Sequence, residues 1–340
     1  MEKDFFVSIC IPSYNRPEEL YRLLKSIDCK AEGVEVLVCE DKAPKRDEVR
    51  AAVERFKTET DLYVKYVENE VNCGYDRNLR ECIKNADGKW MIYMGDDDMF
   101  VPDQLDKYIE FLKEQEGSDV SYVLRSYRAL HNDGSMEEYK YYSDNKFFDA
   151  GFETYEELYR KSVFISGFAF KRELTMENLT DRFDGTLLYQ LYILAEICIN
   201  HKAAYYGTPF TQSIDGGTPY FGNSESEKKL YTPGTITVDN SVAFVKNFFV
   251  ITEYIDQKYG GNSTQYVKED MSRYSYPILS VQRKKGRKVF KEYDIRLREI
   301  GLDCTKYYKI YFWGLYMFGE KMCDFGIRTV KRVLGKTPKL

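Results

Sequence analysis

Histidine is scarce in this sequence, and paired cysteines are missing. The chain has 2 histidines among 340 residues, and none of its 8 cysteines has Cys-x-x-Cys spacing. This composition argues against zinc sites built on histidine or paired cysteine, so we expect any bound metal to have oxygen ligands. Cys10 and Cys39 lie in apolar runs, where a free thiol acts as a small apolar side chain. We therefore predict a reducing, cytoplasmic setting.

Long apolar segments are missing as well. The run Ile310–Phe318 has 9 residues, well short of the roughly 20 that a transmembrane helix needs. The opening stretch MEKDFFVSICIP is too charged, and its apolar part too short, for a secretory leader. We therefore expect neither a membrane span nor secretion.

Acidic residues are few in the C-terminal part. Residues 283–340 contain 16 Lys and Arg against 6 Asp and Glu, a net charge of +10, although the whole chain carries −5. Aromatic residues mixed with these cations fit two interpretations. One is a helix lying on an anionic membrane, which would place the protein peripherally at the inner face. The other is a packed helix with a solvated basic face. Nucleic acid is not an expected partner, because no known binding motif is present.

The N-terminal part has a regular alternation of buried strands and amphipathic helices. FFVSICIPSYN and VEVLVCED read as strands buried on both faces, and the helix between them carries a stripe of apolar residues, Leu20, Leu23, Leu24 and Ile27. A helical crossover between buried strands predicts parallel pairing. The alternation continues to about residue 115. Beyond it we expect strands within 119–130 and 162–173, a helix over 184–200, a long functional loop over 207–235, and mostly helix after about 240.

Three polar clusters follow predicted strands: Pro12 to Asn15, Glu40 with Asp41, and Asp96 to Asp98. Ligands of open α/β sheets bind at the carboxyl ends of strands, so we expect these clusters to meet at one crevice. Three adjacent aspartates could hold a divalent cation together with a substrate diphosphate. The alternative is a solvated acidic turn in which Asp98 or Asp103 caps a helix.

The assembled pattern resembles the family 2 glycosyltransferases of GT-A fold. The resemblance is carried by VSICIPSYNRPEEL, VEVLVCED, NEVNCGYDRNLREC and GKWMIYMGDDDMFVPDQL, and it covers residues 5–115 well. It implies an α/β, Rossmann-like GT-A domain over 1–235, with a nucleotide-sugar-binding half (1–115) and an acceptor half (116–235). A mostly helical basic region over 236–340 would follow.

The resemblance also implies a nucleotide-sugar site. Its residues would be Pro12, Tyr14, Asn15, Glu40, Asp41, Asn72, Gly74, Arg77, Asn78 and Asp96. Pro12 and Tyr14 would line the base pocket, and Asp41 would face the base. Arg77 would contact the base or the diphosphate, and Asp96 the ribose. Asn15 is also expected to cap the following helix.

The same resemblance implies a metal site and a catalytic base. Asp97 and Asp98 would share Mn²⁺ or Mg²⁺ with the diphosphate. Inversion needs a carboxylate base, but the expected position near Tyr189 and Gln190 holds no acid. Asp184 is the predicted base, and its two alternatives in the sequence are Asp181 and Glu196.

The predicted function is therefore metal-dependent, inverting transfer of a sugar from a nucleotide-diphosphate donor to a glycan or lipid-linked glycan in cell-surface polysaccharide biosynthesis. Two alternatives stay open. One is an inactive scaffold that kept the fold without the base. The other is a nucleotidyltransferase, although PSYNRPEE is not the glycine-rich, basic phosphate loop that such enzymes carry.

Overall fold

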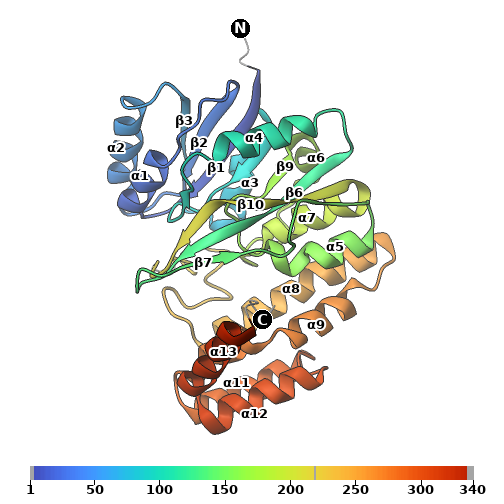
Figure 1. The fold of residues 1–340 in the computed structure, drawn as a ribbon. Helices are drawn as coiled ribbons and strands as arrows, with labels where there is room; N and C mark the ends of the chain where they lie inside the picture. The colour runs from blue at the N-terminus through green and yellow to red at the C-terminus, as the bar shows by residue number, and fades with distance from the viewer. Residues whose placement is uncertain (1–3, 218–219, 335–340) are drawn as a thin grey trace. The chain divides into compact units, whose positions relative to one another are not determined.

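The structure is a computed structural model that describes residues 4–217 and 220–334. The chain divides into two compact units, 1–229 and 230–340. The described part of the first unit contains a ten-stranded sheet in the order β3-β2-β1-β4-β9-β6-β10-β5, with β7 paired to β6 and β8 to β10 (Figure 1).

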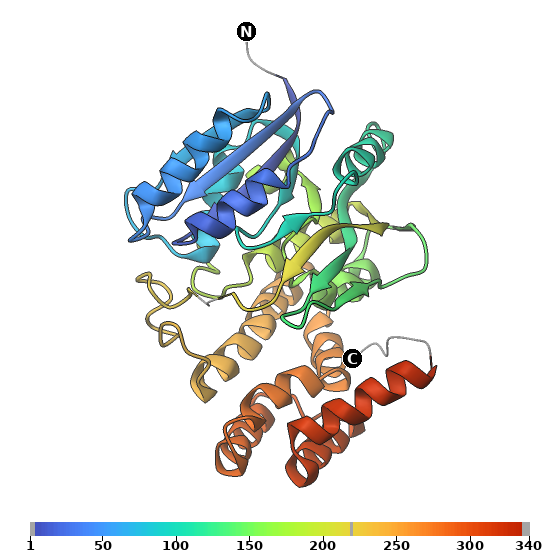
Figure 2. The same cartoon turned by 60° about the vertical axis from the view of Figure 1, so that its left-hand side comes forward.

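The first half of the sheet is parallel. Its strands are β1 (Phe5–Ser13), β2 (Val34–Glu40), β3 (Tyr63–Glu68) and β4 (Gly88–Tyr93), joined by α1 (Pro17–Lys25), α2 (Arg46–Lys57) and α3 (Tyr75–Asn85). Figure 2 shows α1 and α2 side by side against these strands. Every residue of β2 is buried, and Leu20, Leu23 and Leu24 of α1 pack into the core below the sheet. The predicted crossover from β1 to β2 is confirmed.

The second half of the sheet mixes parallel and antiparallel pairs. Its elements in chain order are β5 (Met99–Phe100), α4 (Leu105–Glu114), β6 (Val120–Leu130), β7 (Met136–Tyr139), β8 (Lys146–Phe148), α5 (Phe152–Tyr159), the 3₁₀ helix η1 (Arg160–Ser162), β9 (Ala169–Lys171), α6 (Arg172–Glu177), α7 (Tyr189–Asn200) and β10 (Lys202–Ile214). β9 joins the two halves, because it pairs antiparallel with both β4 and β6.

The loop predicted over 207–235 begins later in the structure than in the prediction. Residues 207–214 were expected to be loop, but they form the second part of β10. The glycine, proline and threonine content of this stretch is typical of loops, yet β10 pairs with β6 and with β5. A register shift between Tyr206 and Thr211 accommodates Pro209. Pairing with distant strands therefore overrides the local composition.

The second unit is helical in its described part, as the sequence predicts for the residues after about 240. It comprises α8 (Val238–Tyr259), α9 (Ser263–Arg273), α10 (Tyr276–Arg283), α11 (Arg287–Glu299), α12 (Lys306–Phe318) and α13 (Glu320–Leu334). α8 packs on α9 and α11, and α12 packs on α10 and α13. Across 4–217 and 220–334, no helix has both the length and the apolar content to cross a membrane.

Candidate active site

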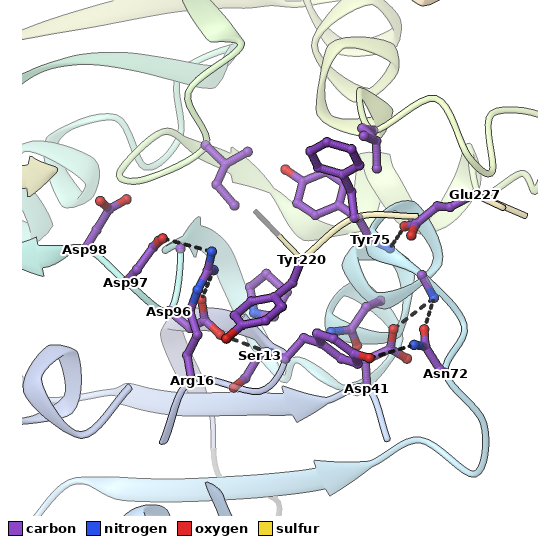
Figure 3. A pocket seen from close by; sticks show the side chains of 18 of the residues that line it. Ser13, Arg16, Asp41, Asn72, Tyr75, Asp96, Asp97, Asp98, Tyr220 and Glu227 are labelled. Atoms are coloured by element: carbon purple, nitrogen blue, oxygen red, sulfur yellow. Dashed lines mark hydrogen bonds and ion pairs between the residues drawn. The ribbon is translucent and has the colours of Figure 1, made fainter. Parts of the chain in front are cut away.

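A cavity of about 390 Å³ opens at the carboxyl ends of β1, β2 and β4 in the first unit (Figure 3). One side, which we call the strand wall, consists of residues at the ends of these strands or just after them: Pro12, Ser13, Tyr14, Arg16, Asp41 and Gly95 to Asp98. The other side, the loop wall, consists of Val163, Phe164, Ile165, Leu187, Tyr220, Phe221 and Glu227. Asn72, Gly74, Tyr75 and Asn78, around the N-terminus of α3, complete the lining. The three strand ends thus meet at one crevice, as expected.

The strand register explains this convergence. β1 lies between β2 and β4, with Ser13 opposite Glu40 and Cys10 opposite Tyr93. All three strands run in the same direction, so their polar continuations emerge at the same edge of the sheet.

Asp96 is the most enclosed of the three adjacent aspartates. Its Oδ2 accepts a hydrogen bond from the backbone N–H of Tyr14 at 3.0 Å, and its Oδ1 forms an ion pair with Arg16 at 2.7 Å. Burial raises the pKa of Asp96 to about 6, although the positive charge of Arg16 acts in the opposite direction. Arg16 is therefore the main internal counter-charge at this position.

Asp97 and Asp98 have different surroundings. The side chain of Asp97 is 28% exposed and lies 3.2 Å from the Arg16 guanidinium. Asp98 is buried and accepts a hydrogen bond from Ser166. Burial, and then the charge of Asp97, raise the pKa of Asp98 to about 7. Figure 3 shows Asp97 turned toward Arg16, while Asp98 points away from Asp96. The alternative of a solvated acidic turn is therefore wrong for Asp96 and Asp98.

Asp41 connects the end of β2 to the start of α3. Its Oδ1 accepts from the backbone N–H of Cys73 at 2.8 Å and from Asn69 Nδ2 at 3.0 Å. Its Oδ2 accepts from the backbone N–H of Gly74 at 2.8 Å. These donors lie just before the positive end of α3, where a carboxylate is favoured.

Gly74 permits a close approach at the same place. Its φ is +85°, and a Cβ atom there would lie 2.4 Å from the hydroxyl oxygen of Ser224. Any side chain would therefore push the loop that carries Ser224 away from α3.

The loop wall is attached to α3 by two further carboxylates. Asp76 accepts from the backbone N–H groups of Leu187 and Tyr189, each at 2.9 Å. Glu227 accepts from the backbone N–H groups of Tyr75 and Gly222, each at 2.8 Å. Burial raises the pKa of Asp76 to about 7, although its two backbone hydrogen bonds lower it.

Aromatic rings narrow the cavity. Tyr14 and Tyr220 meet edge to face with ring centres 5.9 Å apart, and the Arg16 guanidinium lies 5.2 Å from the centre of the Tyr220 ring. The amide of Asn72 donates a hydrogen bond to the Tyr14 hydroxyl at 3.2 Å. A flat ring and an anionic group could thus be bound next to each other, by Tyr14 and Arg16 respectively.

Nine of the predicted site residues line the cavity: Pro12, Tyr14, Asp41, Asn72, Gly74, Asn78, Asp96, Asp97 and Asp98. Glu40 does not. It accepts hydrogen bonds from the backbone of Lys42 and Ala43 and pairs with Arg46, so it closes the turn after β2. Arg77 is half exposed, and its Nε lies 3.9 Å from Glu81.

Asn15 does not cap α1 as predicted. The N-cap residue is Arg16, which makes no side-chain cap bond, and Asn15 Oδ1 accepts instead from the backbone N–H of Lys45 at 3.2 Å. Asn15 has a φ of +62°. This left-handed conformation, which asparagine tolerates better than most residues, directs its side chain to the start of α2.

The predicted base is also absent from the cavity lining. Both carboxylate oxygens of Asp184 face the guanidinium of Arg80. Gln190, near the position where the resemblance led us to expect an acid, is 2% exposed and donates to the backbone carbonyl of Val163 at 3.0 Å. Through this hydrogen bond Gln190 helps to hold Val163, a residue of the loop wall, in place.

Several lining residues were not predicted. The sequence did contain a signal for Arg16, because a cation directly after the first strand must lie at the same sheet edge as the aspartates. Tyr220 and Glu227 lie within the loop that was expected to be functional, but no motif singled them out, since this loop is more than a hundred residues from the strand ends that they face.

The described residues contain no group of three or more His, Cys, Asp or Glu side chains arranged to hold a metal. This does not conflict with a donor-linked cation, because Mg²⁺ is commonly held by one or two carboxylates together with substrate phosphates. Asp97, which is partly exposed at the cavity, fits that requirement. Asp98 fits it only if Ser166 releases it.

The mixed α/β sheet, with a helical C-terminal part, resembles the fold of the GT-A transferases. The fold agrees with a solved structure titled as mannosyltransferase PcManGT from Pyrobaculum calidifontis in complex with GDP-Man and Mn2+. The TM-score is 0.50 at 14% identity, over 94% of this chain and 89% of that one. The model of the family described as "Glycosyl transferase family 2" matches residues 8–175. Residues 8–175, just under half of the chain, therefore belong to that family.

Two curated relatives match over part of their length. Abequosyltransferase RfbV of Salmonella typhimurium is 30% identical over 100 residues, which cover 29% of this chain and 30% of that protein. UDP-Glc:alpha-D-GlcNAc-diphosphoundecaprenol beta-1,3-glucosyltransferase WfgD of Escherichia coli is 25% identical over 130 residues, which cover 38% of this chain and 48% of that protein. The chain thus spans between about a third and a half of these relatives.

Proposed function

We propose that the chain is an inverting glycosyltransferase that moves a sugar from a nucleotide-diphosphate donor to a glycan or lipid-linked glycan. One observation carries this proposal: in a family 2 fold, a single cavity places an aromatic platform, Asp41, Arg16 and three adjacent aspartates next to one another. The names of both curated relatives, an abequosyltransferase and a glucosyltransferase acting on a diphosphoundecaprenol-linked sugar, support a role in cell-surface polysaccharide biosynthesis.

The donor site that we propose follows the strand wall. The base lies against Pro12 and Tyr14 with Asp41 at its edge, and the ribose hydroxyls donate hydrogen bonds to Asp96. Arg16, which already neutralises Asp96 and Asp97, lies where it can form charge-assisted hydrogen bonds with the diphosphate. Asn72, Gly74 and Asn78 shape the pocket from the start of α3.

Asp97 and Asp98 are the residues that we propose to hold Mn²⁺ or Mg²⁺ when the donor is bound. The cation would neutralise charge on the departing diphosphate. Before the donor binds, Arg16 holds Asp97 and Ser166 holds Asp98. The chain thereby limits repulsion between the carboxylates on its own, and cation and donor are expected to bind together.

Asp184 stays the predicted base. Its pairing with Arg80 means that it can accept a proton from the acceptor only after Arg80 moves away. Exchange of Asp184 for Asn should then abolish transfer to the acceptor but leave donor binding unchanged. Equal loss of both would assign Asp184 a structural role.

All eight cysteines are free, which supports the predicted reducing, cytoplasmic setting.

The proposal is tested by incubating the protein with a panel of nucleotide sugars, Mn²⁺ and lipid-linked acceptors, and measuring the release of free nucleoside diphosphate. The double variant Asp97→Ala/Asp98→Ala should lose this release. Exchange of the exposed Asp61, on the loop before β3, for Ala is the matched control. Release that persists in the double variant contradicts the metal assignment. Binding of a donor without release under any condition would favour the inactive scaffold. In a separate incubation, release of pyrophosphate from a nucleoside triphosphate and a sugar 1-phosphate would favour the nucleotidyltransferase.

A further inference from the structure

The last two helices expose large apolar side chains. On α12 these are Ile310, Trp313, Met317 and Phe318, which are 54–60% exposed, and on α13 they are Met322 and Phe325, at 63% and 73%. Scattered exposed apolar residues are ordinary, but six large ones within sixteen consecutive residues form a concentration that water does not favour.

Helical periodicity places these side chains on the outer faces. Ile310, Trp313 and Met317 are separated by three and four residues, so they share one face of α12. Tyr308, Phe312 and Leu315 are buried on its opposite face. On α13, Met322 and Phe325 are likewise three residues apart.

The two helices also pack against each other. α12 packs on α13, and a Cβ atom at Gly314 would lie 3.9 Å from the Cys323 sulfur. Gly314 and Cys323 are on the flanks of their helices, next to the exposed apolar positions. We call the surface made by the six side chains the α12–α13 face.

The charges around this face are positive. α12 contains no acidic residue, and Lys306, Lys309 and Lys321 are exposed. The two acidic residues of α13 are engaged, because Glu320 pairs with Lys284 and Asp324 accepts from the Tyr276 hydroxyl. The surface thus combines apolar and aromatic side chains with three exposed lysines, for which no ion pair is described among 4–217 and 220–334.

We propose that the α12–α13 face binds the surface of a membrane that contains anionic lipids. Trp, Phe, Met and Ile would enter the boundary between headgroups and acyl chains, while the lysines meet lipid phosphates. The net charge of +10 over residues 283–340 argues against a second copy as the occupant, because two such regions would repel each other across an interface. A nucleic acid offers anions but no apolar phase for Met317 and Phe325.

The first test measures binding to vesicles by flotation. Vesicles of phosphatidylcholine with 30% phosphatidylglycerol, by our choice of probe, should carry the protein to the top of the gradient. Vesicles of phosphatidylcholine alone should carry much less of it. The triple variant Lys306→Gln/Lys309→Gln/Lys321→Gln should weaken binding to the anionic vesicles by about a hundredfold, at roughly fivefold per lysine.

The contribution of the apolar side chains is tested by the double variant Trp313→Ser/Phe325→Ser. This variant should lower partitioning of the protein into the anionic vesicles about tenfold or more. The matched control is Met136→Ser/Phe147→Ser, which removes two side chains that are 58% and 57% exposed in the first unit. Because all four side chains are exposed, both variants should keep the thermal unfolding temperature of the parent protein. Equal partitioning of the two double variants would overturn the proposal.

A third measurement reports insertion directly. The chain has two tryptophans, and Trp90 is 2% exposed whereas Trp313 is 54% exposed. Brominated anionic vesicles should quench the Trp313 emission and leave that of Trp90 unchanged. The variant Trp313→Phe should lose the quenching but still float. Flotation without quenching would indicate purely electrostatic contact and refute the apolar docking.

Sedimentation of the lipid-free protein identifies the competing occupant. A dimer that Trp313→Ser/Phe325→Ser converts to a monomer, in a protein that does not float, would assign the face to a second copy. Nucleoside diphosphate release with a soluble acceptor is measured in parallel. The inference therefore fails or holds independently of the proposed function.

Discussion

The strand wall and the loop wall of the cavity are held in place by different means. The strand wall is the continuation of three neighbouring parallel strands, so its position follows from the hydrogen-bonded register of the sheet. The loop wall has no such ladder. It is fastened by two carboxylates. Asp76, in the first turn of α3, accepts from the backbone N–H groups of Leu187 and Tyr189. Glu227, in the loop wall, accepts from the backbone N–H of Tyr75 at the start of α3 and from that of Gly222.

The start of α3 is the point to which both walls of the cavity are attached. Asp41 joins the strand wall to it, while Asp76 and Glu227 join the loop wall to it. Each carboxylate satisfies backbone donors that would otherwise be unpaired within a partly buried region. Removing these carboxylates one at a time should therefore show how much each one contributes to the stability of the strand wall and of the loop wall.

The largest effect is expected at Asp41. The variant Asp41→Ala leaves the buried N–H groups of Cys73 and Gly74 and the amide of Asn69 without this acceptor, so we expect the free energy of unfolding to fall by about 3 kcal/mol. Urea unfolding measures this change, and exchange of the exposed Asp61 for Ala should leave it within about 0.5 kcal/mol. A small loss at Asp41 would mean that the β2 end is held by the sheet alone.

Asp76 should come second. Asp76→Ala removes the acceptor of the Leu187 and Tyr189 N–H groups, and we expect a loss of about 2 kcal/mol. Hydrogen exchange should speed up at residues 186–189, while β1 and β4 keep their protection. Faster exchange in the strands as well would show that the two walls form one cooperative unit.

Glu227 tests the outer part of the loop wall. Glu227→Gln replaces a carboxylate that accepts two backbone hydrogen bonds by an amide with one oxygen, so we expect a loss of about 1 kcal/mol and faster exchange at residues 220–227. The control is Glu225→Gln two residues earlier, where the side chain is 90% exposed and pairs only with Lys228 in the hydrogen bonds and ion pairs that are described for it. Identical behaviour of the two variants would rule out the fastening role.

The smallest effect is expected away from both walls, at His131. Its ring hydrogen-bonds Asp215 at 2.9 Å, and this bond raises the pKa of His131. Glu137 faces the same ring at 3.6 Å. Because the folded pKa is above the unfolded value of about 6.5, the stabilisation is complete below that pH and disappears as the pH rises through the folded value. At pH 5.5 the free energy of unfolding of the wild type should exceed that of His131→Gln by a few tenths of a kcal/mol.

At pH 8.5 the two proteins should be equally stable. A constant difference at both pH values would mean that the ring acts through packing or a neutral hydrogen bond.

Several features of the site could be predicted from local patterns. The apolar runs of β1, β2 and β4 specify buried strands, and polar residues directly after them must then lie at one edge of a parallel sheet. That reasoning located Tyr14, Asp41 and Asp96 without knowledge of any distant contact. It failed for Glu40 and Asn15, whose side chains are taken by nearby backbone donors of the next turn and helix.

The sequence by itself determined the alternating strands and helices of the first 115 residues and the acidic strand end, because backbone periodicity and register act over short distances along the chain. The tertiary structure decided how Asp184 and Gln190 are occupied, and that Tyr220 and Glu227 close the cavity. These contacts join residues far apart in the chain. They depend on packing and on the pairing of buried charges, for which no local sequence pattern exists.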